Sequence, residues 1–103
     1  MSYSMIRTDR FADQLNDLIL YIADDTGSID TALQYLDQLE TVILRLRDFP
    51  ESGSTPRYSL LKRQGYRVLI AQRHLVFYKV DNDNRRIILY AIVDSRREYR
   101  NLI

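Results

Sequence analysis

Apolar residues in the first half of the chain recur at intervals of three and four, which is the period of an amphipathic helix. The positions on the first such face are Phe11, Leu15, Leu18 and Ile22, widened by Ile19 and Ala23. Thr8 or Asp9 is placed to cap this helix, and residues 24–28 break it, with Gly27 at a C-cap position. The pattern therefore predicts a helix of several turns before residue 24.

A second helical pattern follows at once. Its apolar positions are Ile29, Ala32, Leu36, Leu39, Ile43 and Leu46. Ser28 or Asp30 is placed to cap its start, and Pro50 ends it because proline lacks the backbone N–H that a helix needs. Two helices joined by a short break form a helical hairpin. The heptad-like seam of the second helix also permits a coiled-coil dimer, and this alternative stays open.

The last third of the chain changes to short strand-like runs, bounded by turn residues. Strands are expected at residues 3–7, 66–72, 74–80 and 86–93. A tight turn falls at Gln72 and Arg73, residues 81–84 form a strong hairpin turn, and the almost wholly apolar residues 87–93 indicate a central strand. The pattern predicts an α+β fold of order β-α-α-β-β-β. In it, an antiparallel sheet carries the helical hairpin on one face.

Composition limits the function classes. The 103 residues fit a single domain spanning residues 1–103. Cysteine is absent, which excludes disulfides and Cys-based metal sites and favours an intracellular protein. Neither a secretory signal nor a membrane span is expected. Residues 1–56 hold four Arg against ten Asp and Glu, and residues 57–103 hold eleven Arg and Lys against four. This asymmetry indicates either an anionic partner or acidic helices beside basic strands.

Three segments carry a resemblance to a known family. They are Gly65-Tyr66-Arg67-Val68, then Leu-Val-Phe-Tyr-Lys-Val-Asp at residues 75–81, then the apolar residues 87–93 leading into Arg96-Arg97-Glu98-Tyr99. In this order and chain length they resemble the RelE/ParE superfamily, the toxins of type II toxin–antitoxin modules. The resemblance implies one of two activities on one fold. RelE-like members cleave mRNA in the ribosomal A site, whereas ParE-like members poison DNA gyrase without catalytic residues. In both, a cognate antitoxin neutralises the toxin.

The same resemblance implies candidate site residues. For a metal-independent endoribonuclease, the catalytic candidates are His74, which stands where the family usually has an arginine, together with Arg97 and Tyr99. His74 is the only histidine, and its ordinary pKa suits acid–base work. The candidates for binding an anion or a partner are Arg67, Arg73, Tyr78, Arg96, Arg97 and Arg100. No cofactor and no metal are expected.

Each candidate has a simpler structural alternative. The alternative for His74 is a solvated residue beside a turn, at the edge of a strand. Tyr78 is on the same strand face, and its alternative is a half-buried tyrosine of the sheet. The alternative for Arg96 is a salt bridge to Asp94 or Glu98, and the alternative for Tyr99 is to pack the tail back onto the sheet.

We expect a cytoplasmic toxin held by an antitoxin in a hetero-oligomer. The histidine in place of arginine and the acidic helical half favour gyrase inhibition. Cleavage of mRNA on the ribosome is the second interpretation, and a non-toxic interaction domain is the third.

Overall fold

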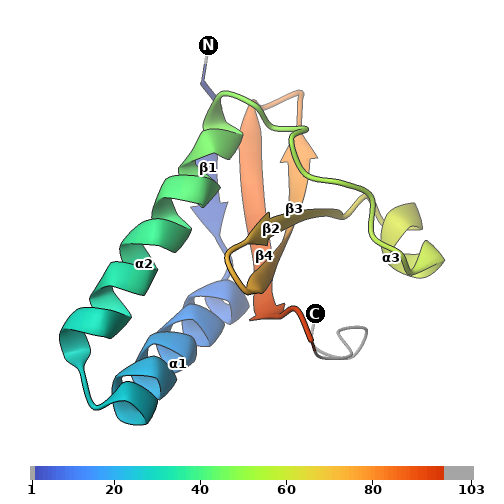
Figure 1. Ribbon diagram of the computed structural model, residues 1–103. Helices are drawn as coiled ribbons and strands as arrows, with labels where there is room; N and C mark the ends of the chain where they lie inside the picture. The colour runs from blue at the N-terminus through green and yellow to red at the C-terminus, as the bar shows by residue number, and fades with distance from the viewer. Residues whose placement is uncertain (1, 97–103) are drawn as a thin grey trace.

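The computed structural model describes residues 2–96 and contains four strands packed against a helical hairpin (Figure 1). In chain order the elements are β1 (Ser4–Arg7), α1 (Asp9–Thr26), α2 (Ile29–Leu44), the 3-10 turn η1 (Arg45–Arg47), α3 (Ser59–Arg63), β2 (Arg67–Ala71), β3 (His74–Asp81) and β4 (Arg86–Asp94). The predicted α+β class and the order of the hairpin and strands are confirmed. Helix α3 was not predicted.

The strands form one sheet in the order β1-β4-β3-β2. Strands β2, β3 and β4 pair antiparallel, as predicted, but β1 pairs with β4 in parallel. The sheet is therefore mixed. After β1, the helical hairpin and the loop that follows it carry the chain to β2, at the opposite edge of the sheet. Strand β4 lies between β1 and β3, which confirms that residues 87–93 belong to a central strand.

Both long helices are capped by the side chains that the sequence indicates. Thr8 accepts a hydrogen bond from the backbone N–H of Phe11, and Ser28 accepts one from that of Thr31. Gly27 ends α1 with a φ of 68°, a left-handed conformation that glycine adopts without a steric cost. The second helix ends earlier than predicted, at Leu44, and η1 then buries Leu46 before Pro50 is reached.

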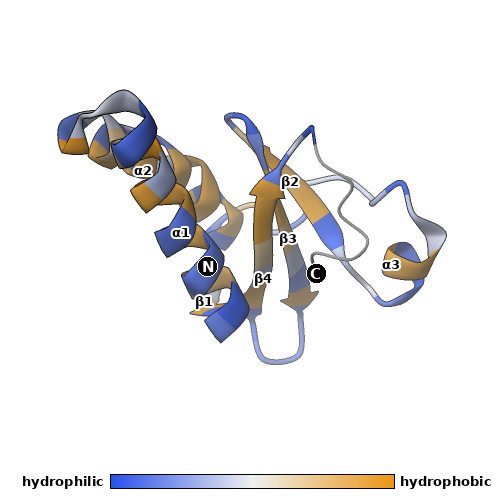
Figure 2. Ribbon diagram, turned by 90° about the horizontal axis from the view of Figure 1, so that it is seen from below, coloured by the Kyte–Doolittle hydropathy of each residue, from blue (hydrophilic) through white to orange (hydrophobic). Residues whose placement is uncertain are grey.

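The main core lies between the hairpin and the sheet. Its fully buried side chains include Phe11, Leu39, Ile43, Leu46, Val76 and Leu89. The seam of α2 is thus used inside the chain, which removes the basis for a coiled-coil dimer. Ile29, the first residue of that seam, is 70% exposed. A second, smaller core of Leu61, Val68, Phe77, Ala91 and Val93 includes one residue of α3 and lies on the other face of the sheet. Figure 2 shows α3 on the side of the sheet away from the hairpin.

A β-bulge in β4 changes the direction of its side chains halfway along the strand. Phe77 pairs with Ala91 but Tyr78 pairs with Leu89, so Tyr90 is an extra residue in β4. The Thr8 hydroxyl lies 3.0 Å and 3.1 Å from the carbonyl oxygens of Leu89 and Tyr90. The N-terminal cap of α1 therefore also satisfies backbone groups at the bulge.

Within residues 2–96, none of the helices has the length and hydrophobicity needed to cross a lipid bilayer.

Candidate functional site

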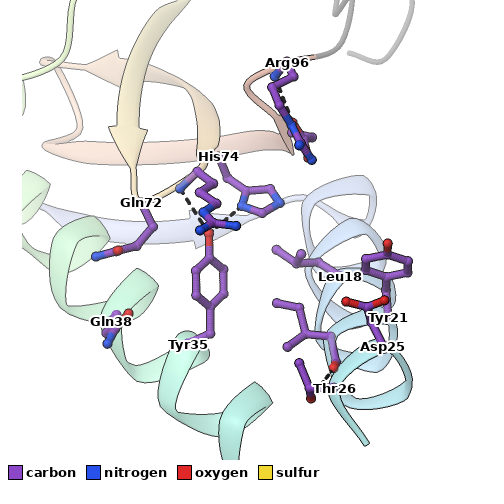
Figure 3. A pocket seen from close by; sticks show the side chains of 12 residues that line it. Leu18, Tyr21, Asp25, Thr26, Tyr35, Gln38, Gln72, His74 and Arg96 are labelled. Carbon is purple, nitrogen blue, oxygen red and sulfur yellow. Dashed lines mark hydrogen bonds and ion pairs between the residues drawn. The ribbon is translucent and has the colours of Figure 1, made fainter.

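A cleft of about 490 Å³ opens where the helical hairpin meets the ends of β3 and β4. Its lining residues come from α1, α2, the β2–β3 turn and the end of β4 (Figure 3). Leu18 and Ile22 supply apolar surface, and Arg73, His74 and Arg96 supply cationic or titratable groups. The fold therefore brings together three of the residues that the sequence marked as candidates.

Tyr35 is the residue that organises this cleft. It extends from α2 towards the β2–β3 turn (Figure 3), and its hydroxyl lies 2.7 Å from Nδ1 of His74. The same hydroxyl accepts a hydrogen bond of 3.1 Å from the backbone N–H of Arg73. When Tyr35 donates its own proton to Nδ1, the proton of the neutral imidazole lies on Nε2. One side chain thus joins α2 to the turn that begins β3.

His74 is a buried histidine at the start of a central strand, with only 9% of its surface exposed. The alternative of a solvated residue at the edge is therefore wrong. Burial lowers the pKa of His74 below its ordinary value of 6.5, Asp94 opposes this shift, and Arg96 adds to it. The ring is consequently neutral near pH 7, and a neutral imidazole provides no cation for a phosphate.

The β2–β3 turn places Gln72 and Arg73 at the rim of the cleft. Gln72 has a φ of 58°, the left-handed region that residues with a Cβ rarely adopt. The hydrogen bond from the Arg73 N–H to Tyr35 holds this turn in place. The side chain of Arg73 is exposed, so solvent reaches its guanidinium at the rim of the cleft.

Arg96 is paired with Asp94. Its backbone N–H and its Nε donate to Asp94 Oδ1 over 2.8 Å and 3.1 Å, and its Nη2 lies 3.0 Å from Oδ2. These hydrogen bonds hold the pKa of Asp94 well below its usual range. The structural alternative for Arg96 is thus observed, and its charge is largely offset by its neighbour.

Tyr78 shares a strand face with His74, as predicted, and this face is turned towards the hairpin, but Tyr78 is completely buried. Its hydroxyl donates to the carbonyl of Pro50 over 2.8 Å and accepts from the N–H of Gly53 over 3.1 Å. Neither a nucleic-acid base nor a partner side chain reaches this ring. The assignment of Tyr78 as a binding residue is therefore wrong in this structure, because its hydroxyl is used to fix the loop before α3.

Arg67, the cross-strand neighbour of Tyr78, holds the same loop. Its Nη2 donates to the carbonyl oxygens of Glu51 and Gly53 over 2.8 Å and 2.6 Å. This use of the guanidinium leaves little of it for an external anion. Arg97, Tyr99 and Arg100, the remaining candidates, lie outside the described residues. Between residues 2 and 96, no group of His, Asp and Glu side chains is arranged to hold a metal ion.

Comparison with known proteins identifies the family of this chain. Residues 5–99 match the family model described as the ParE toxin of the type II toxin–antitoxin system parDE. The chain belongs to the ParE toxin family. No match was found among curated proteins.

Two solved structures share the fold of this ParE-family chain. The chromosomal ParDE toxin–antitoxin system of P. aeruginosa aligns with a TM-score of 0.73 and 16% identity, covering 90% of this chain and 96% of the other. The RelBE2 toxin–antitoxin complex of Mycobacterium tuberculosis aligns with a TM-score of 0.62 and 15% identity, covering 91% and 99%. The resemblance to the RelE/ParE superfamily is confirmed, and the fold is common to both branches.

Sequence reasoning about this ParE-family toxin missed Tyr35. A signal was present, because Tyr35 comes three residues after Ala32 and four before Leu39, two positions of the buried face of α2. A tyrosine at such a position needs a partner for its hydroxyl. What the sequence did not indicate is that this partner would be the only histidine of the chain.

Proposed function

We propose that this ParE-family toxin arrests growth by binding and inhibiting DNA gyrase, without a catalytic residue of its own. It acts in the cytoplasm and is held inactive by a cognate antitoxin in a hetero-oligomer. The argument rests on the state of the candidate catalytic groups, on the match to the ParE family model, and on the surface left for a protein partner.

One observation carries the proposal: His74 serves as a neutral, buried contact of Tyr35. A ribonuclease of this fold needs a proton acceptor, a proton donor and cations around the scissile phosphate. Among the described candidates, Arg96 is paired with Asp94 and Arg67 holds a loop. Because these side chains are already bonded within the protein, they support a toxin that acts by binding its target.

Exposed apolar side chains on the hairpin support the antitoxin as a partner. Leu20, Tyr21, Ile29, Leu33 and Leu44 are each 47% or more exposed. Exposed apolar side chains of this size are suited to contact with a protein partner. A partner that covers the hairpin buries these residues and leaves the opposite face of the sheet accessible.

Cleavage of mRNA on the ribosome remains a second candidate because of one feature of the cleft. His74 and the exposed side chain of Arg73 line the same cleft, and Nε2 carries the proton of the neutral ring when Tyr35 donates to Nδ1. A phosphate seated between these two groups would contact one donor and one cation.

Growth arrest by substituted toxins distinguishes the two candidates. For a gyrase inhibitor, we expect His74→Gln and Arg97→Gln to arrest growth as strongly as the native chain when each is expressed without antitoxin. Binding of the antitoxin, measured in parallel, shows that each variant is folded. Loss of arrest in a variant that still binds antitoxin would contradict gyrase inhibition and favour the nuclease.

A further inference from the structure

The face of the sheet turned away from the hairpin is only partly covered by α3. Ile87 and Leu89 belong to the core beneath the hairpin, so Ile88 and Tyr90 point to the other side. In the pairing register, Ile6 and Lys79 are the neighbours of Ile88. We call this surface, made by Ile6, Tyr66, Lys79, Ile88 and Tyr90, the open face. All five side chains are at least partly exposed.

A lysine between two tyrosines lies at the centre of the open face. The Lys79 Nζ lies 4.5 Å from the ring centre of Tyr66 and 5.1 Å from that of Tyr90. The two rings meet edge to face, with centres 5.2 Å apart. Burial raises the pKa of Tyr66, Tyr90 adds to the shift, and the cation of Arg10 opposes it. Arg10, in the first turn of α1, is therefore close to the same cluster.

The charge asymmetry of the sequence becomes a difference between the helical hairpin and the elements that follow it. Residues 9–44, which make the hairpin, hold eight Asp and Glu and one Arg. Residues 57–86, which include α3, β2 and β3, hold eight Arg and Lys and two Asp. One of those two, Asp81, is bonded to Asn84 and Arg86. The hairpin is thus acidic, and the excess cations lie in α3 and the strands. Lys79 belongs to the open face and Lys62 and Arg63 to α3, whereas Arg73 lines the cleft on the hairpin side.

Cations around the open face come from separate elements. Helix α3 packs through Leu61 on the same side of the sheet, and its last turn presents exposed Lys62 and Arg63 just before Tyr66. Lys79 comes from β3 and Arg10 from α1. Cations spread in this way match a row of phosphates better than a single carboxylate. The acidic hairpin is repelled by the same polyanion, so the molecule is oriented with its open face towards it.

We propose that the open face binds the phosphate backbone of double-stranded DNA. Resting on the proposed function, we further infer that it does so on the DNA held by gyrase. With a net charge of +1, the toxin alone binds DNA weakly and mainly at low salt. Gyrase supplies the affinity, and the open face adds contacts to the DNA segment beside the enzyme.

Fluorescence anisotropy with a short labelled duplex tests the first part without gyrase. The native toxin should bind the duplex at low salt and release it as salt is raised. In the Lys62→Gln/Arg63→Gln variant, binding should weaken. The slope of log K against log salt should fall in magnitude by about 1.8, at about 0.9 for each lost phosphate contact. Absence of binding by the native toxin at low salt, or an unchanged slope in the variant, would overturn the proposal.

The matched control removes two cations from the other side of the molecule. Arg45 and Arg47 lie exposed on η1, whose Leu46 belongs to the core beneath the hairpin. The Arg45→Gln/Arg47→Gln variant has the same change of net charge and should keep the native slope. Equal weakening in both variants would show a general charge effect and would contradict a docking face. Tighter binding of a single-stranded RNA than of the duplex would also overturn the proposal.

A supercoiling assay with gyrase tests the second part. The Lys62→Gln/Arg63→Gln variant should need several-fold more protein than the native toxin for equal inhibition, and the η1 variant should not. A toxin that binds duplex DNA but leaves gyrase unaffected would refute the proposed function while preserving the DNA-binding face. Inhibition of gyrase by native toxin that fails to bind DNA would refute the face alone.

Discussion

The hydroxyl of Tyr35 lies 2.7 Å from Nδ1 of His74, and this contact joins the helical hairpin to the start of a central strand. It accounts for the burial of the only histidine, and it holds the neighbouring turn through the N–H of Arg73. This contact gives His74 a structural role, whereas the sequence by itself also permits a catalytic one.

Removing the Tyr35 hydroxyl should destabilise the protein. In Tyr35→Phe, the Arg73 N–H and Nδ1 of His74 lose their partner, at a cost of about 1–3 kcal/mol in the free energy of unfolding. Urea denaturation measures this change. Tyr21→Phe is the control, because Tyr21 is 66% exposed, and it should shift stability by less than about 0.5 kcal/mol. Equal effects of the two substitutions would contradict the role given to Tyr35.

Stability should fall in mildly acidic solution because of His74. Its pKa is lowered in the folded state, so between the folded and unfolded pKa values the unfolded chain binds more protons. This contribution is fully present above the ordinary pKa of 6.5 and is lost as pH falls through and below that value. An NMR titration of the His74 ring should give a midpoint below 6.5. In His74→Gln, the free energy of unfolding should change less with pH between about pH 7 and 5 than in the native protein. A midpoint above 6.5 would contradict the account.

Glycine at position 72 should stabilise the β2–β3 turn. Gln72 has a φ of 58°, which costs a residue with a Cβ about 1 kcal/mol. Gln72→Gly should raise the free energy of unfolding by roughly that amount. Arg85, with a φ of 51° in the β3–β4 turn, offers a matched substitution, Arg85→Gly, with a similar expected gain. A loss of stability at position 72 alone would show that the Gln72 side chain makes a contact outweighing the strain.

Removing the buried hydroxyl of Tyr78 should lower the stability of the fold without changing growth arrest. Tyr78→Phe leaves the Pro50 carbonyl and the Gly53 N–H without their partner, which should cost about 1–3 kcal/mol. Growth arrest should persist at temperatures where the variant is folded. Gly53→Ala should destabilise the same contact, since a Cβ there would lie 2.6 Å from the Tyr78 hydroxyl. Loss of arrest in a fully folded Tyr78→Phe protein would contradict a purely structural role.

The sequence predicts the elements of this fold well because their signals are local. The caps at Thr8 and Ser28 and the apolar spacing of both long helices follow from neighbouring residues. The parallel pairing of β1 with β4 joins residues 82 positions apart, and local periodicity is insensitive to such contacts. The bulge at Tyr90 depends on the register between β3 and β4, which the alternation within one strand does not give. Helix α3 is only five residues long and has no side-chain cap, so its signal is weak.

The candidate site was predicted less completely, and for a physical reason. His74, Arg73 and Arg96 were marked by residue type, and the fold does bring them to one cleft. Whether each is available for chemistry depends on its partner, and Tyr35 and Asp94 decide this for His74 and Arg96. Tyr78 shows the same limit, because alternation along β3 gives its face correctly but not the loop that encloses it.

The central claim is that this toxin acts by inhibiting gyrase and not by cutting RNA. The most direct measurement places purified toxin in two parallel reactions, supercoiling of relaxed plasmid by gyrase and cleavage of mRNA in a translating extract, each with and without excess antitoxin. The account predicts inhibited supercoiling with accumulation of cleaved DNA, reversal by antitoxin, and intact mRNA. Normal supercoiling at saturating toxin, together with mRNA cleavage that the antitoxin suppresses, would contradict it.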